Sequence, residues 1–296
     1  AVASRGTVEQ TADDVKISGL TMGITSATST GSGATEAAAY FPTTALANAV
    51  LSDVICQSEN SGVYSMRVGV EYAGTYTRVT GGDHSFAGSG DASGTFTDCV
   101  GGSYSFGYYY WAVGAASGTF IRCTGGTYSF GGDNSPASGT FIDCVAGSGS
   151  FGGYGTASGT FTDCVGGSNS FGNGGTASGT FTDCVAGDYG FGHSGTASGT
   201  FTDCVGGTRC FAADSGGTAS GIFIRCSGED LAKYATVTST AQFTDCVNTG
   251  TGFGAYASTP VDAGAVFIRC LGAGTWMNVG TTRACYTSAW ATIDNE

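Results

Sequence analysis

The chain has 296 residues, and only 11% of them are charged, against about 25% in typical globular proteins. Its net charge of −13 argues against nucleic acid or an anionic membrane as a partner, because both are bound through Lys and Arg, and no apolar run approaches the roughly 20 residues needed for membrane insertion. Gly accounts for 53 residues, yet aromatic residues reach 12%, which excludes a disordered Gly/Ser linker.

The N-terminal part of the chain contains only degenerate forms of a repeat. Residues 1–16 carry no repeat, and we predict that they form an N-terminal cap. The segment "ISGL" then begins the repetitive part, and a Gly-, Ser-, Thr- and Ala-rich stretch at 23–48 is expected to be an inserted loop. The segments "LSDV" and "YTRV" follow, and they place Val54 and Val79 in a slot that Cys occupies later in the chain.

The repeat is clearest in "SGTFTDCVGGSNSFGNGGTA" (158–177), and its Cys recurs every 20 residues from Cys144 to Cys204. The unit lacks the 3.6-residue period of a helix, while "GTFT" alternates in the manner of a strand and "VGGS" is typical of a turn. Such a unit predicts one coil of an all-β parallel solenoid, in which each coil is stable only when stacked on others. Residues 17–270 accommodate about twelve coils of this kind.

The residues of each coil can be assigned to columns that run along the solenoid. The Phe of "GTFT" is expected to point inward, so the Thr residues beside it point outward. The Cys slot also accepts Val and Leu, which indicates an apolar interior position. A second Phe, ten residues later, is expected to point inward or to lie at a corner. Its members are Phe86, Phe106, Phe130, Phe151, Phe171, Phe191, Phe211 and Phe253.

One coil is longer than the others between its second Phe and the next strand. This loop spans 107–116, and it carries four adjacent aromatic residues that cannot all turn inward. They are Tyr108, Tyr109, Tyr110 and Trp111. Exposed rings of this kind suit stacking on sugar rings, whereas the alternative is that the loop covers a neighbouring coil or packs between subunits. A similar excess at 253–267 adds Tyr256, and residues 271–296 are the predicted C-terminal cap.

Two further columns lie at the end of the first strand. The nine regularly spaced Cys are expected to be buried free thiols rather than disulfides or metal ligands, which fits folding in a reducing cytosol. The preceding column is charged, and its alternating signs near both ends predict ion pairs between coils. Its Asp residues from 143 to 203 are expected to stay solvated, or alternatively to bind divalent cations weakly or a basic partner.

No catalytic motif stands out, and we expect neither a cofactor nor a metal site. The outward Thr pairs resemble the ice-binding face of antifreeze solenoids, although exposed strands commonly contain Thr. Scattered polar residues are candidates for carbohydrate chemistry, but nothing in the sequence selects a catalytic pair among them. They are Asp83, His84, Asp91, Asp133, Asp188, His193, Asp214, Glu229, Asp230 and Asp262.

Two features carry a family resemblance. The spacing of the inward positions and the segment "DDVKISGLTM" (13–22) resemble the right-handed parallel β-helix of the pectin-lyase-like superfamily. The Gly-rich repeat is similar to repeats in bacteriophage tail fibres and tailspikes.

The resemblance implies a receptor-binding protein of a phage tail, assembled in the host cytoplasm and carried on the virion. It would act as a homotrimer, with other virion tail proteins and a bacterial cell-surface glycan as partners. A polysaccharide-degrading glycosidase or lyase on the same scaffold is one alternative, and a bacterial surface or ice-binding solenoid is another.

Overall fold

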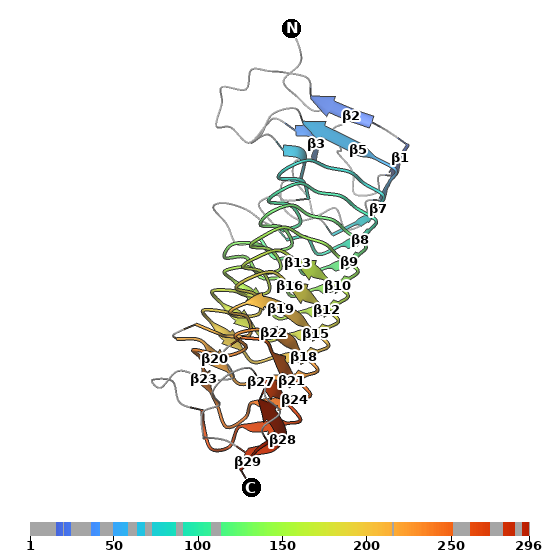
Figure 1. The fold of residues 1–296 in the computed structure, drawn as a ribbon. Coiled ribbons are helices and arrows are strands. Elements are labelled where there is room, and N and C mark those ends of the chain that lie inside the picture. Colours follow the sequence, from blue (N-terminus) through green and yellow to red (C-terminus); the bar gives the residue numbers. More distant parts are fainter. Residues whose placement is uncertain are drawn as a thin grey trace.

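The computed structural model is an elongated right-handed parallel β-solenoid with strands β2 (Thr21–Ile24) and β29 (Thr292–Asn295) at opposite ends of the rod (Figure 1). It describes residues 16–19, 21–24, 37–41, 50–58, 64–68, 73–86, 91–107, 114–214, 216–250, 261–272, 281–287 and 292–295. All regular structure in these residues is β-strand, and no helix occurs among them. The predicted all-β parallel solenoid is therefore confirmed.

The solenoid has about nine turns in the described residues, which is fewer than the twelve coils predicted. The regular turns run from Tyr76 to Phe267. Strands at Ile17 and Leu51 continue the same ladder in register, so the repeat was correctly located there. Much of the chain between these early strands lies outside the described residues, so the turns seen are somewhat fewer than the coils predicted.

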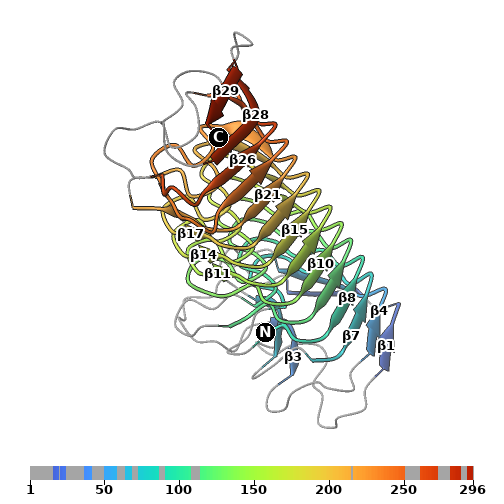
Figure 2. The same ribbon diagram turned by 90° about the horizontal axis from the view of Figure 1, so that it is seen from below.

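The longest ladder is a row of short parallel strands along one face of the rod (Figure 2). Each strand pairs in register with its counterpart one coil later, as in the pairing of Phe161 with Phe181. The strands are β1 (Lys16–Ser18), β4 (Val50–Ser52), β7 (Thr75–Thr77), β8 (Thr95–Thr97), β9 (Thr119–Ile121), β10 (Thr140–Ile142), β12 (Thr160–Thr162), β15 (Thr180–Thr182), β18 (Thr200–Thr202), β21 (Ile222–Ile224), β24 (Gln242–Thr244) and β26 (Val266–Ile268).

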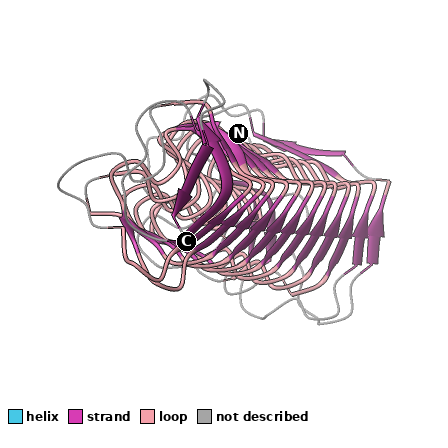
Figure 3. Ribbon diagram, turned by 60° about the horizontal axis from the view of Figure 1, so that its bottom comes forward, coloured by secondary structure: helices cyan, strands magenta, loops and turns pink. Residues whose placement is uncertain are grey.

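Two shorter ladders complete the cross-section, and turns and bends connect them (Figure 3). One follows the first strand after a sharp corner and contains β13 (Val165–Gly166), β16 (Val185–Ala186), β19 (Val205–Thr208), β22 (Ser227–Glu229), β25 (Val247–Asn248) and β27 (Leu271–Gly272). The other precedes the first strand and contains β11 (Thr156–Ala157), β14 (Thr176–Ala177), β17 (Thr196–Ala197), β20 (Thr218–Ala219) and β23 (Thr236–Val237).

The ends of the rod contain further strands. Near the N-terminus, β2 (Thr21–Ile24) pairs with β5 (Ile55–Ser58), and β3 (Ala37–Phe41) pairs with β6 (Tyr64–Val68). At the C-terminal end, β28 (Thr281–Thr287) continues the ladder and pairs antiparallel with β29 (Thr292–Asn295). Strand β3 lies within residues 23–48, which the sequence predicted to be an inserted loop. The two cap boundaries remain predictions.

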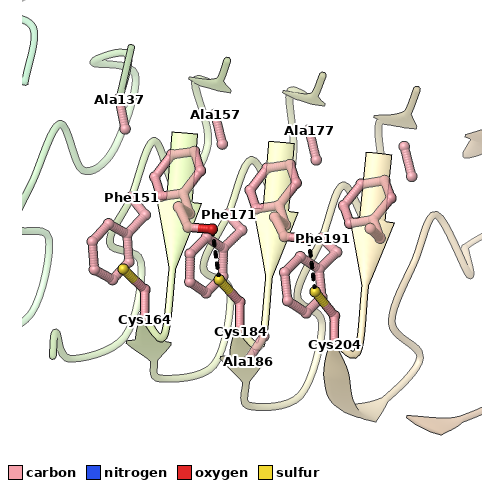
Figure 4. Packing of buried hydrophobic residues seen from close by; sticks show 14 of the residues in the cluster. Ala137, Phe151, Ala157, Cys164, Phe171, Ala177, Cys184, Ala186, Phe191 and Cys204 are labelled. Carbon is pink, nitrogen blue, oxygen red and sulfur yellow. Dashed lines mark hydrogen bonds between the residues drawn. The ribbon is translucent and has the colours of Figure 1, made fainter. Parts of the chain in front are cut away.

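The core contains two stacks of Phe rings that run side by side along the rod, with the ring planes of one stack perpendicular to those of the other, and a column of thiols (Figure 4). Phe161 stacks on Phe181 of the next coil, with ring centroids 4.8 Å apart, whereas Phe171 meets Phe161 edge to face at 5.6 Å. Parallel in-register coils place identical residues one above another, so each ring packs against both stacks. The predicted inward column of the first Phe is therefore confirmed.

The second Phe column lies inside the solenoid and at a corner, except that Phe253 lies outside the described residues. Phe171 is fully buried, and its backbone has a φ of 56°. A left-handed backbone is unfavourable for a bulky residue, by about 1–2 kcal/mol, but it turns the chain sharply enough to direct the ring into the core. Asp163 makes the same kind of corner after strand β12, with a φ of 54°.

Candidate functional site

The predicted sugar-binding aromatic residues lie outside the described residues. They are Tyr108, Tyr109, Tyr110, Trp111 and Tyr256. The structure does describe both flanks of the first group: a Cβ added to Gly107 would lie 2.5 Å from the carbonyl oxygen of Ala115. The two ends of this segment are therefore in contact on the body of the rod.

Other coils connect their second Phe to the next strand of the longest ladder with fewer residues. A Cβ added to Gly152 would lie 2.6 Å from the carbonyl oxygen of Thr156, so residues 153–155 suffice there, whereas 108–114 occupy the equivalent place in the longer coil. The extra residues are an insertion at a point where the solenoid needs none. Insertions on a rigid scaffold are common carriers of binding function.

Several acidic candidates bind backbone groups of the next coil. Asp83 accepts a hydrogen bond from the Ser103 N–H, and Asp91 accepts one from the Ala115 N–H, each at 2.8 Å. Asp133 is half-buried and Asp262 is exposed. Within the described residues, no side-chain interaction joins Asp91, Asp133 or Asp262 to another candidate. Asp83 and Asp91 therefore stabilise the stacking of neighbouring coils.

His84 belongs to an external stack of rings. Its ring lies 5.0 Å from that of Tyr104, which in turn lies 5.3 Å from that of Tyr128, with nearly parallel planes. Burial lowers the pKa of His84, and the nearby Asp83 carboxylate opposes this shift. Because the rings cover one another's faces, this stack presents mainly ring edges to solvent.

The charged corner column forms the predicted ion pairs between coils. Arg122 binds Asp98 through Nε and Nη2, at 2.6 and 3.0 Å, and this bond lowers the pKa of the carboxyl group. Equivalent pairs join Arg78 to Asp53, Arg225 to Asp203 and Arg269 to Asp245.

The middle of the same column is purely acidic. Asp143, Asp163 and Asp183 form no ion pair among the described residues. Slight desolvation, followed by the two neighbouring carboxylates, raises the pKa of the exposed Asp163. The described residues contain no cluster of His, Cys, Asp or Glu that could hold a metal ion. Cation binding by this column therefore has no support in the described geometry.

Two ladders border this acidic column. The Thr residues of the first strands face outward, as in the exposed Thr160 of β12. Beyond the corner runs an exposed aliphatic ladder with Val145, Val165, Val185 and Val205, of which Val145 is the most exposed at 46%. Ile121 and Ile142 interrupt the Thr array, and ice binding stays an untested alternative.

The cysteines line the interior. All eleven cysteines whose side chains are described are buried free thiols. Each thiol of the main column lies against the carbonyl oxygen of the inward aromatic residue one coil earlier, as Cys184 does at 3.4 Å from Phe161. The expectation of a buried thiol column is therefore confirmed.

A polar cluster lies where three consecutive coils depart from the repeat. In the first coil, the exposed Ser194 hydroxyl lies 2.9 Å from Nδ1 of His193 and 3.1 Å from Oδ2 of Asp214 on the next coil. The Tyr189 ring meets the His193 ring edge to face at 4.7 Å. His193 is 7% exposed, and its Nε2 has no hydrogen-bond partner among the described residues.

The cluster continues over the second and third coils. The guanidinium carbon of Arg209 lies 5.6 Å from the ring centroid of Tyr234, and Lys233 Nζ lies 5.0 Å from it. Lys233 also forms an ion pair with Asp230 at 3.1 Å.

Thr208 links two of the acidic candidates. Its N–H donates to Asp188 at 2.8 Å, and its hydroxyl donates to Glu229 at 3.2 Å. The structure therefore brings Asp188 and Glu229, and separately His193 and Asp214, close to shared partners. Sequence reasoning named these acids and His193 but missed Tyr189, Ser194, Arg209, Lys233 and Tyr234.

A signal for the missed residues was present in the repeat itself. The segment "GSNSFGNGG" (167–175) is small and polar, whereas "GDYGFGHSG" (187–195) and "GTRCFAADSGG" (207–217) carry rings and charges at equivalent places. Substitutions confined to successive coils at one corner predict a shared surface, because residues one repeat apart are neighbours in a solenoid.

The described part of the chain contains no helix that is both long and apolar enough to cross a membrane. Comparison with known proteins gives no match to a family model, a curated protein or a solved structure. The structure shows a parallel β-solenoid, but no family model or homologue supports the expected resemblance to the pectin-lyase-like superfamily or to tailspikes.

Proposed function

We propose that this protein is a receptor-binding component of a bacteriophage tail, a tailspike or tail fibre that recognises bacterial surface polysaccharide. In this proposal the solenoid is the rigid rod, and the aromatic segment at 108–114 is the receptor contact. The protein would assemble in the host cytoplasm as a homotrimer and join other virion tail proteins. Reducing conditions during assembly suit its buried thiols.

The observation that carries the proposal is the insertion between Gly107 and Ala115. These two residues are in contact, as their equivalents are in the shorter coils, so the solenoid would close without residues 108–114. The insertion nevertheless concentrates three Tyr and one Trp in a chain otherwise rich in Gly. Rings with apolar faces and polar edges are effective binding anchors.

The test replaces residues 108–114 with Asn-Gly-Gly, the crossing found at 173–175. Binding of the native and shortened proteins to immobilised bacterial envelope polysaccharides is compared, and thermal unfolding confirms that the shortened protein is folded. We expect the native protein to bind and the shortened protein to lose at least tenfold in affinity.

Equal binding by the two proteins would show that the aromatic segment is not the receptor contact. Absence of binding by the native protein across a broad panel of envelopes would contradict the proposal as a whole. Release of reducing ends or unsaturated products from a bound polysaccharide would instead identify a polysaccharide-cleaving enzyme.

A further inference from the structure

The polar cluster formed by residues between 188 and 234 differs from the rest of the rod in how its cationic side chains are paired. Five of the six Lys and Arg whose side chains the structure describes are bound to a carboxylate. Among those six, Arg209 has no carboxylate partner and instead lies over the Tyr234 ring. A guanidinium group in this setting keeps several N–H donors for another ligand.

His193 provides an independent sign of a ligand. Its side chain is more than nine-tenths buried, yet Nε2 has no hydrogen-bond partner among the described residues. Leaving a buried polar nitrogen unpaired is energetically unfavourable. The equivalent residue one coil earlier, Asn173, satisfies its amide by donating to Asn169 Oδ1 and to the Tyr189 carbonyl oxygen. This place in the coil therefore does not force a buried side chain to leave a polar atom without a hydrogen bond.

The groups around these two residues are suited to hydroxyl groups. Asp188 and Glu229 are exposed, and each uses one of its carboxylate oxygens on Thr208, which leaves further acceptor positions. Ser194 offers an exposed hydroxyl, and the half-buried rings of Tyr189 and Tyr234 offer apolar surface beside these polar groups.

The balance of charge selects the class of ligand. The cluster contains the carboxylates of Asp188, Asp214, Glu229 and Asp230, but only the two cations Arg209 and Lys233, and Lys233 is already paired. The whole chain has a net charge of −13, which repels anions further. An anionic sugar is therefore disfavoured relative to a neutral one.

We infer that Arg209, His193 and the acidic and aromatic side chains beside them form a binding site for a neutral saccharide, separate from the segment at 108–114. Arg209 donates to sugar oxygens, and Asp188 and Glu229 accept from sugar hydroxyls. Three coils at a spacing of about 4.8 Å give the site a length of about 10 Å along the rod. The inference rests on the proposed recognition of a polysaccharide and adds the chemistry of the ligand.

The repeat supplies conservative variants for the test. Asn occupies two equivalent positions at 169 and 173, so Tyr189→Asn, Arg209→Asn and His193→Asn introduce a residue that this corner already accepts. Asn also tolerates the left-handed backbone at 189 and 209, which have φ values of 62° and 52°. Tyr104→Asn is the matched control, because Tyr104 occupies the equivalent position on a distant coil with a φ of 58°.

The first measurement uses bacterial envelope polysaccharide separated by anion exchange into neutral and acidic fractions. We expect the native protein and Tyr104→Asn to bind the neutral fraction equally, and Arg209→Asn and Tyr189→Asn to lose about tenfold or more in affinity. Preference for the acidic fraction would overturn the assignment of a neutral ligand. Unchanged binding by both variants would overturn the site but leave the proposed function standing.

The second measurement does not depend on the polysaccharide assay. The chain has only two His, so the ring protons of His193 and His84 can be followed by NMR and assigned with His193→Asn. During titration with glucose, galactose and mannose, the His193 signal should move while the His84 signal stays. If the His193 signal moves with none of these sugars and with no neutral polysaccharide fraction, the inference is wrong, even if the native protein binds bacterial envelopes through the segment at 108–114.

Discussion

The thiol of Cys184 lies 3.4 Å from the carbonyl oxygen of Phe161, one coil earlier. The same contact recurs along the column, so the thiols lie in a continuous interior row against the backbone of the preceding coil. The thiols of this row are fully buried, so reagents in solution cannot reach them, and burial raises the pKa of Cys210. Buried neutral thiols are poor nucleophiles.

The first prediction concerns the reactivity of these thiols. In the folded protein the eleven buried thiols should not react with a water-soluble disulfide reagent, whereas all of them should react in denaturant. Cys184→Val should change stability by less than about 1.5 kcal/mol, because Val occupies this column at 54 and 79. Rapid labelling of many thiols without denaturant would contradict the buried column.

The second prediction concerns the stacked rings. Phe161→Ala should destabilise the protein by about 3–5 kcal/mol, because it leaves a cavity between the rings of Phe141, Phe171 and Phe181. Phe161→Leu is the control and should have a smaller effect, since Leu51 occupies the same column. Thermal and denaturant unfolding measure both variants, and equal losses would show that ring packing does not determine stability here.

The third prediction concerns the close approach of neighbouring coils. A Cβ on Gly159 would lie 2.2 Å from the carbonyl oxygen of Gly139, so Gly159→Ala must push two backbones apart. We expect a loss of about 1–3 kcal/mol. At Gly174 the nearest atom is 3.0 Å away and belongs to the exposed Tyr154 side chain, so Gly174→Ala should be nearly neutral. A similar unfolding temperature for both variants would contradict this packing.

The fourth prediction compares Asp98 and Asp163, which share one column. The Arg122 guanidinium lowers the pKa of Asp98, so its contribution to stability is present above the unfolded pKa of about 3.9 and is lost as pH falls through the folded value. Slight desolvation and the neighbouring carboxylates raise the pKa of the exposed Asp163, so the contribution of Asp163 to stability is most favourable below about pH 3.9 and is lost as pH rises through the folded value.

Substitution by Asn should therefore have opposite effects at the two sites. At pH 7 and low salt, Asp98→Asn should lower the unfolding temperature slightly and Asp163→Asn should raise it slightly. Both differences should shrink at pH 3, and Asn keeps the left-handed corner, because φ is 54° at both positions. Shifts of the same sign at pH 7 would show that coil-to-coil charge interactions do not govern this column.

Much of the fold was predictable because a parallel solenoid turns sequence period into spatial contact. Residues one repeat apart become neighbours, so the spacing of Phe161 and Phe181, or of Asp98 and Arg122, is enough to predict their contact. Alternation in "GTFT" was likewise enough to orient Phe inward and Thr outward. The predicted number of coils is higher than the number of turns seen because the segments at Ile17 and Leu51 were counted as coils, and much of the chain between them lies outside the described residues.

The candidate site was less predictable, since its contacts do not repeat. The carbohydrate-binding aromatics chosen from the sequence lie outside the described residues, and their role stays a prediction. The acids Asp83 and Asp91 were named as chemical candidates, whereas the structure uses them as acceptors for the next coil.

The sequence by itself determined the architecture of this protein, its interior columns and the pairing of charges along its corner. These features depend only on which residues recur at a fixed spacing. The tertiary structure decided how the two Phe stacks meet, because their perpendicular contact requires a left-handed backbone at Phe171. It also decided that Arg209 lies over Tyr234 and that Ser194 lies between His193 and Asp214, because these side chains cross from one coil to the next in directions that no period specifies.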